Sequence, residues 1–137
     1  MPVLNEITGL QAILPRIRRE WCDQILMVDG GSSDGSLEYA RQCGCETYVQ
    51  RRTGIRFAHI EAWPLIRGDI VITLSPDGNC PAEAIPQLTA AMCAGDDMVI
   101  ASRYLDGLKS EDERTLKVLR WGGSYFLQVF RELYYWS

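Results

Sequence analysis

The sequence lacks the residues and patterns that mark several common classes of protein. It contains one histidine, His59, and its five cysteines form no Cys-x-x-Cys pair, which argues against a structural zinc site. No apolar run approaches the roughly 20 residues that a membrane-spanning helix requires. A signal peptide begins with basic residues followed by an apolar stretch, whereas this chain begins with Met1, Pro2 and the acidic Glu6. We therefore expect a cytoplasmic protein.

An excess of positive charge is also missing. The chain has 14 Lys and Arg against 18 Asp and Glu, which gives a net charge of -4. Proteins that bind nucleic acid generally do so by neutralising phosphates with basic side chains. The composition therefore argues against a nucleic-acid partner.

What is present is enough apolar material for one packed domain. The 137 residues are 47% hydrophobic and 23% charged, so the chain can bury a core, and its length is that of a single domain. Cys43 and Cys45 flank one glycine and admit two interpretations, a strained redox pair or ordinary reduced thiols, of which the second suits a cytoplasmic protein better. His59 is expected to be an ordinary surface residue rather than a catalyst.

Apolar runs that end in turn residues alternate with helical periods. The nearly continuous apolar character of these runs is typical of parallel strands covered on both faces. Strands are predicted at residues 24–28, 69–74 and 98–101, with a weaker one at 46–50. Helices are predicted over residues 7–21 with a break at Pro15, after a cap at Ser33 or Asp34, over 55–66, over 85–92, and in a long amphipathic pattern from Glu111 to Leu133. The alternation predicts an α/β fold.

In parallel α/β sheets, ligands bind at the carboxyl ends of the strands, so the residues that follow each run matter most. The first such turn, residues 29–36, is Asp-Gly-Gly-Ser-Ser-Asp-Gly-Ser. It has neither the Gly-x-Gly-x-x-Gly spacing of a dinucleotide fold nor the signature of a phosphate-binding loop. By itself it could be a tight turn with a helix cap.

Four segments at predicted strand ends, taken together, are more specific. They are Pro2-Val3-Leu4-Asn5-Glu6, residues 29–36, Ser75-Pro76-Asp77-Gly78-Asn79, and Ser102-Arg103-Tyr104. In this order they resemble the inverting family 2 glycosyltransferases, nearest to the dolichyl-phosphate mannose synthase type. That family has Pro-x-x-Asn-Glu, Asp-Asp-Gly-Ser-x-Asp-Gly-Thr, Asp-x-Asp and Ser-Arg-Tyr elements. The resemblance implies a Rossmann-like, GT-A type fold with a mostly parallel sheet flanked by helices.

The resemblance also implies a nucleotide-sugar donor at the strand ends. The residues implied for the nucleotide pocket are Pro2, Asn5, Glu6 and Asp29, with Gly54 near the base. Asp77 is implied as the ligand of a Mg²⁺ or Mn²⁺ ion on the donor diphosphate, with Asn79 completing its shell. Carboxylate oxygens suit such hard cations, which offset the charge that develops on the leaving diphosphate.

Two positions depart from the family pattern. Gly30 replaces the second aspartate of the first Asp-Asp element, and Ser75 replaces the first aspartate of Asp-x-Asp. A hydroxyl is a weaker ligand for a hard cation than a carboxylate. Either the metal binds weakly, or a subgroup of the family tolerates this form, and we favour the second interpretation.

The family places an apolar first strand directly before the proline, where this chain has only Met1. We expect a single minimal or truncated domain over residues 1–137, with the first strand and C-terminal elements missing.

The C-terminal third combines a basic cluster with aromatic residues. The basic residues are Arg103, Lys109, Arg114, Lys117 and Arg120. They are either a solvated helix face or a clamp, led by Arg103, for the phosphate of a lipid acceptor. The aromatic residues either pack in the core or in an oligomer, or form an interfacial helix at the membrane face. They are Trp121, Tyr125, Phe126, Phe130, Tyr134, Tyr135 and Trp136.

The leading hypothesis is an enzyme that transfers a hexose from a nucleotide-sugar to a polyprenyl phosphate or related acceptor. Such an acceptor is already anionic, so no strong general base is needed. One alternative is a catalytically silent domain that keeps the nucleotide pocket. A third hypothesis, a nucleotidyltransferase for sugar phosphates, is disfavoured because the expected Gly-rich and basic opening is absent.

Overall fold

The computed structural model describes residues 1–78, 80–101 and the backbone of 128–131. Its first sheet contains β1 (Pro2–Val3), β2 (Leu26–Asp29) and β3 (Glu46–Val49), in the order β1-β2-β3 and all parallel. The predicted strands at 24–28 and 46–50 are therefore confirmed to within a few residues. Pro2, which we expected to follow a strand, is itself paired in one, opposite Val28.

The second sheet contains β4 (Ile70–Ile72), β5 (Met98–Ile100) and β6 (Gln128–Arg131), in the order β4-β6-β5. Both β4 and β5 pair antiparallel with β6, so these two strands run in the same direction as each other. The strands predicted at 69–74 and 98–101 are confirmed.

The helical prediction from Glu111 to Leu133 is wrong for residues 128–131, which form β6. These residues include the β-branched Val129 and the aromatic Phe130, which pair with strands on both sides. Strand propensity and two pairing partners together outweigh the helical spacing. The rest of the predicted helix lies outside the described residues.

The other predicted helices are present. They are α1 (Ile7–Ile13), α2 (Ser36–Gln42), α3 (Ile55–Ala62) and α4 (Ala84–Cys93), with short 3₁₀ segments η1 (Leu14–Arg16), η2 (Arg19–Trp21) and η3 (Trp63–Leu65). As predicted, the first helix breaks at Pro15, which lies in η1, because proline lacks the N–H that would continue the α-helical ladder. No helix within residues 1–78 and 80–101 is both long and apolar enough to cross a membrane.

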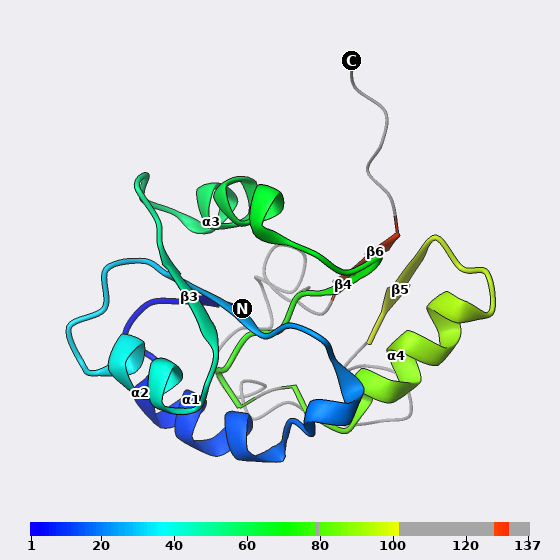
Figure 1. The fold of residues 1–137 in the computed structure, drawn as a ribbon, viewed down its shortest axis with the longest axis horizontal. Helices are drawn as coiled ribbons and strands as arrows, with labels where there is room; N and C mark the ends of the chain where they lie inside the picture. The colour runs from blue at the N-terminus through cyan, green and yellow to red at the C-terminus, as the bar shows by residue number, and fades with distance from the viewer. Residues whose placement is uncertain (79, 102–127, 132–137) are drawn as a thin grey trace, which may run out of the picture.

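Helices cover both faces of the strands (Figure 1). Side chains of α1, α2 and α4 form the larger core cluster, which includes Leu10 and Met27, both fully buried. Val28 points the opposite way and packs with Ala58 and Ala62 of α3. This alternation along β2 explains the continuous apolar run, because each face of the strand meets a helix layer.

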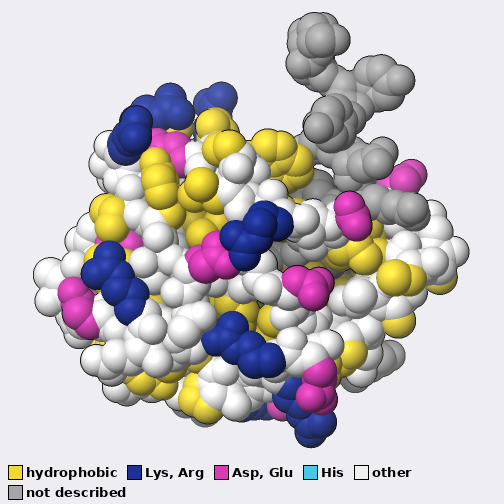
Figure 2. Space-filling model, in the orientation of Figure 1, with side chains coloured by type: hydrophobic (Ala, Val, Ile, Leu, Met, Phe, Trp, Pro, Cys, Tyr) yellow, Lys and Arg dark blue, Asp and Glu magenta, His cyan; other side chains and the backbone are white. Residues whose placement is uncertain are grey.

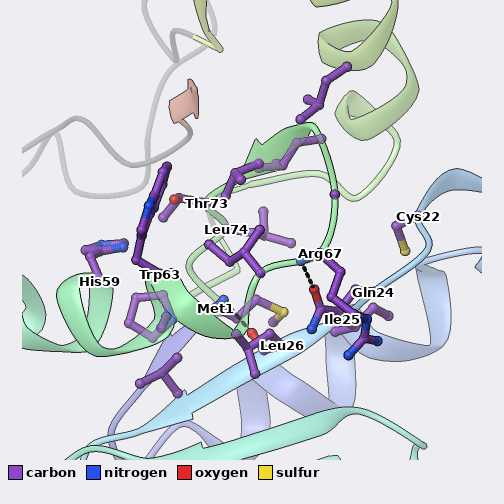
Figure 3. A pocket seen from close by; sticks show the side chains of 18 of the residues that line it. Met1, Cys22, Gln24, Ile25, Leu26, His59, Trp63, Arg67, Thr73 and Leu74 are labelled. Carbon is purple, nitrogen blue, oxygen red and sulfur yellow. Dashed lines mark hydrogen bonds between the residues drawn. The ribbon is translucent and has the colours of Figure 1, made fainter. Parts of the chain in front are cut away.

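A cavity of about 1040 Å³ separates the edge of β1 from the edge of β4. Figure 3 shows Met1 and Leu26 on one side of it, Thr73 and Leu74 on another, and His59 on α3. His59, expected at the surface, is half-buried here, and burial lowers its pKa.

Gln24 and Arg67, which line the cavity near the starts of the strands, belong to a polar cluster. The Arg67 guanidinium donates to Glu46, and its backbone N–H donates to Gln24 Oε1 at 3.1 Å (Figure 3). Gln24 Nε2 in turn donates to Glu46 at 2.9 Å. The cluster ties the segment before β4 to β2 and β3 at the end of the sheet opposite the predicted site.

Candidate active site at the carboxyl ends of the strands

Asp29, the last residue of β2, organises the loop that follows it. Its Oδ2 accepts hydrogen bonds from the backbone N–H groups of Gly31 at 3.0 Å and Ser32 at 3.1 Å, and the residue is only 1% exposed. Gly31 has a φ of 98°, in the region that favours glycine. The carboxylate that was predicted to meet the nucleoside therefore also fixes the shape of the 29–36 loop.

Asn5 connects the end of β1 to this loop. Its Oδ1 accepts a hydrogen bond from the Ser33 backbone N–H at 2.9 Å, and its own N–H donates to Ser32 Oγ at 2.9 Å. Asn5 has a φ of 54°, the only positive φ of a non-glycine residue in the described chain, and asparagine tolerates this conformation better than most residues. Two hydrogen bonds thus connect Asn5, from the Asn-Glu pair identified in the sequence, to the 29–36 loop.

The next two backbone N–H groups continue this connection. Glu6 N–H donates to Ser36 Oγ at 3.0 Å, and Ile7 N–H donates to Asp34 Oδ2 at 2.9 Å. The predicted cap of α2 at Ser33 or Asp34 is wrong: the N-cap is Gly35, with a φ of 92° and no side-chain cap. The Asp34 carboxylate accepts from the backbone N–H of Ser36, the first residue of α2, at 3.0 Å, and also from the first residue of α1, a partner distant in sequence that local cap rules do not reveal.

The Asp34 carboxylate is held in its charged form. The Ser36 hydroxyl donates to Asp34 Oδ1 at 2.6 Å, and together with the bond from Ile7 it lowers the pKa of Asp34. A carboxyl with a lowered pKa stabilises the folded state above its unfolded-state pKa, and loses that contribution as the pH falls through the folded-state value.

Asp34→Ala is therefore expected to lower the midpoint of thermal unfolding by about 4 °C at neutral pH, because the start of α1 loses an acceptor. The difference from the parent should shrink as the pH falls from about 5, and disappear once Asp34 is protonated in the parent as well. Thermal unfolding followed by circular dichroism across this pH range measures both effects. A difference that grows on acidification contradicts the assignment.

The turn that carries Asp77 reaches the same helix. A Cβ added at Gly9 would lie 1.7 Å from the Pro76 carbonyl oxygen, so the backbone of α1 touches the turn directly. Pro76 is buried, whereas Asp77 is exposed. The first turn of α1 therefore contacts both the 29–36 loop and the turn after β4.

A third loop adjoins Asp29 from the side of β3. Gln50 N–H donates to the Asp29 carbonyl oxygen at 2.9 Å, which starts residues 50–54 beside the end of β2. Gly54 ends this loop as the N-cap of α3, with a φ of 109°. The structure thus brings the loops of Asn5, Glu6, Asp29, Gly54 and Asp77 to one edge of the fold, with Pro2 in the adjoining strand.

Two predicted site residues, Asn79 and Arg103, lie outside the described residues. Ser75 is half-buried, and Gly30 lies against β1, where an added Cβ would be 3.3 Å from the Val3 carbonyl oxygen. Across the part of the chain that the structure describes, no three His, Cys, Asp or Glu side chains gather as a metal site would require. Among the described residues, a divalent cation held by Asp77 would fit as one shared with the oxygens of a bound diphosphate.

Sequence reasoning missed three residues of this region. Ser36 was interpreted only as part of the 29–36 turn, and neither Gly9 nor Glu61 was singled out. For Gly9 a signal existed, because an isolated glycine inside a helical pattern commonly has a packing reason. The contacts of Ser36 and Glu61 join segments distant in sequence and have no local signature.

Comparisons with known proteins agree with this arrangement. The chain is 34% identical over 112 residues to an undecaprenyl-phosphate 4-deoxy-4-formamido-L-arabinose transferase of Aeromonas hydrophila, covering 72% of this chain and 34% of the relative. It is 32% identical to a dolichol-phosphate mannosyltransferase of Pyrococcus furiosus, covering 82% of this chain and 34% of that protein. The chain thus spans about a third of the length of these relatives.

Among solved structures, glucosyl-3-phosphoglycerate synthase from Mycobacterium tuberculosis in complex with Mn²⁺, uridine diphosphate and glucosyl-3-phosphoglycerate has a TM-score of 0.64. That match has 23% sequence identity and covers 72% of this chain and 40% of the other, and it confirms the predicted GT-A type α/β fold. The family described as Glycosyl transferase family 2 matches residues 1–135. This match covers nearly the whole chain and includes the loops around α1, so the chain belongs to glycosyl transferase family 2.

Proposed function

We propose that this chain carries the donor-binding part of an enzyme that transfers a hexose from a nucleotide-sugar to a polyprenyl phosphate, with inversion at the sugar. The observation that carries the proposal is the convergence of the 29–36 loop and the Pro76–Asp77 turn on the first turn of α1. Loops at the carboxyl ends of parallel strands are where α/β folds bind nucleotides. Two relatives are named for transfer to undecaprenyl phosphate and dolichol phosphate, which supports the acceptor class.

In this proposal Asp29, Asn5 and Glu6 form the nucleoside end of the pocket, and Asp77 forms the diphosphate end. Asp77 would hold Mg²⁺ or Mn²⁺ together with the donor phosphates, and the cation, when bound, would offset the charge of the departing diphosphate. The fixed 29–36 loop needs no ordering when the donor binds, which favours affinity. Asn79 remains a predicted additional ligand.

For the acceptor, the proposal keeps Arg103 as the residue that holds the lipid phosphate near the sugar. An anionic phosphate oxygen placed there attacks without losing a proton, so the proposal requires no general base in this part of the chain. A polyprenyl acceptor lies in a bilayer, and the proposal therefore places the protein at the membrane face.

The rival function is a nucleotide-binding domain without catalysis. The observation behind it is that Asp77 is the only carboxylate of its turn, because the position two residues earlier is Ser75. The two functions differ in turnover, while both include binding of the donor.

A donor panel tests the proposal. Thermal unfolding is measured with guanosine and uridine diphosphate sugars, each with and without Mn²⁺, and sugar transfer to a short polyprenyl phosphate is then measured with the donor that binds. A donor at about 100 times its dissociation constant adds about 2.7 kcal/mol of stability, which is readily seen. Stabilisation by a donor supports the donor site, and transfer in addition supports the enzyme over the silent domain. The absence of any donor effect overturns both functions.

A further inference from the structure

The loop of residues 50–54 is the basic edge of the proposed donor site. Figure 2 shows basic side chains gathered over the start of α3, where the sequence has Arg51, Arg52 and Arg56. The loop begins at the Asp29 carbonyl oxygen and ends at Gly54. It is therefore adjacent to the residue that organises the 29–36 loop.

One carboxylate, that of Glu61 on α3, binds the backbone of the 50–54 loop. Glu61 Oε2 accepts hydrogen bonds from the Arg51 backbone N–H at 2.7 Å and from the Tyr48 hydroxyl at 3.1 Å. Glu61 Oε1 accepts from the Arg52 backbone N–H at 3.2 Å and forms an ion pair with the Arg52 guanidinium at 3.4 Å. Each of its oxygens thus has two donors, and the Glu61 side chain is only 11% exposed.

Two further contacts complete the frame around the loop. The Gln50 side-chain amide donates to the Arg52 carbonyl oxygen at 2.8 Å. The Arg52 guanidinium lies over the Phe57 ring, 4.1 Å from its centroid. Consecutive backbone groups of a short exposed loop are therefore fixed by a strand, by a helix and by the loop itself.

The base of this frame is itself anchored. Glu61 lies on α3, one residue before Ala62, which packs with Ala58 and Val28 in the core between α3 and β2. Tyr48 of β3 packs against the same cluster. The hydrogen bond from Arg51 N–H, the strongest of the influences on Glu61, also lowers the pKa of this carboxyl, so it stays charged at neutral pH.

A carboxylate with this many local donors does more than a surface ion pair, which is worth little by itself. It presets the conformation of a loop, and a loop that is already ordered loses less entropy when a ligand binds to it. We infer that Glu61 is a positioning residue, which holds the 50–54 loop ready to receive the nucleoside end of the donor. This inference rests on the proposed function, and it adds a role to a residue behind the pocket rather than in it.

Glu61→Gln tests the inference with little change in size. The amide nitrogen of glutamine cannot accept the hydrogen bonds of the carboxylate oxygen that it replaces, so the donors on that side lose their acceptor. Hydrogen exchange should become faster at the Arg51 and Arg52 amides. The affinity for the nucleoside diphosphate that binds the parent should fall about tenfold, as measured by titration calorimetry without metal.

Glu46→Gln is the matched control, because Glu46 also accepts from an arginine and from a side-chain amide, at the opposite ends of the strands. It should cost thermal stability without changing nucleotide affinity. Glu61→Asp, which keeps the charge, should recover part of the lost affinity.

The outcomes separate the inference from the function on which it rests. If the parent binds the nucleotide and Glu61→Gln binds it with the same affinity, the positioning role of Glu61 is overturned and the proposed function stands. Equal losses of affinity in Glu46→Gln and Glu61→Gln also overturn it, because general destabilisation then explains both. No binding of any nucleotide by the parent overturns the proposed function, and the inference with it.

Discussion

Replacing Asp77 with asparagine is expected to weaken Mn²⁺-dependent binding of a nucleoside diphosphate by more than about 100-fold. Substitution of residues that only support a metal ligand costs about 10-fold to 100-fold in metal affinity, so loss of a ligand carboxylate should cost at least the upper value. No other carboxylate is present in residues 75–78 to replace it. Titration calorimetry with and without Mn²⁺ measures the effect.

The exposed position of Asp77 makes the prediction specific. Asp77→Asn should unfold at nearly the same temperature as the parent, and its metal-independent nucleotide binding should remain. Asp96→Asn is the control, since it makes the same change in an exposed residue before β5, away from the strand ends of the site. Undiminished metal-dependent affinity in Asp77→Asn removes Asp77 from the site.

Gly9→Ala is expected to destabilise the protein, although alanine is the better helix former. Helix propensity alone favours alanine over glycine by about 1 kcal/mol. The added Cβ, however, would lie 1.7 Å from the carbonyl oxygen of Pro76, a backbone atom that no side-chain rotation can move away. Overpacking of this kind costs about 1–3 kcal/mol and sometimes more, so the steric effect should win.

The same substitution should also weaken metal-dependent nucleotide binding, because the Asp77 turn must move away from α1. Denaturant unfolding and calorimetry on the same variant give the two quantities. Gly68→Ala is the control: its Cβ would meet the Ile70 carbonyl oxygen at 3.5 Å, an ordinary contact, and its stability should change by less than about 0.5 kcal/mol. A stability gain in Gly9→Ala would show that α1 and the turn are not in close contact.

The local features of the fold could be predicted from the sequence because they have local causes. The apolar run before Asp29 predicts a strand covered on both faces, and the break at Pro15 follows from one missing N–H. The order of the motifs predicts which strand ends carry polar residues. The apolar run and the order of the motifs together predict the position of Asp29 at the end of β2.

The remaining features depend on contacts between distant segments. Asp34 was predicted to cap its own helix, and its carboxylate does accept from the Ser36 backbone N–H, but it also bonds to Ile7, and no pattern near Asp34 indicates that partner. Val129 and Phe130 fit a helical spacing, yet their backbone pairs with two strands that come much earlier in the chain. In both cases a partner distant in sequence shapes the structure, and the pattern of neighbouring residues does not reveal that partner.

The role of Glu61 is hidden from the sequence for the same reason. On α3 it is one acidic residue among helix-forming neighbours, typical of a solvated face. Its four donors come from β3 and from the loop before α3, so their convergence is visible only in the structure.

The central claim is that the carboxyl ends of the strands form a donor site around α1, and paramagnetic broadening by Mn²⁺ tests it most directly. Amide spectra of the labelled protein are recorded with a nucleoside diphosphate, before and after Mn²⁺ replaces Mg²⁺. The account predicts broadening of the amide signals of Gly31, Gly54 and Asp77, with those of Gly44 and Gly68, at the opposite ends of the strands, unchanged. Broadening centred on Gly44 and Gly68, or none at the three site residues, would contradict it.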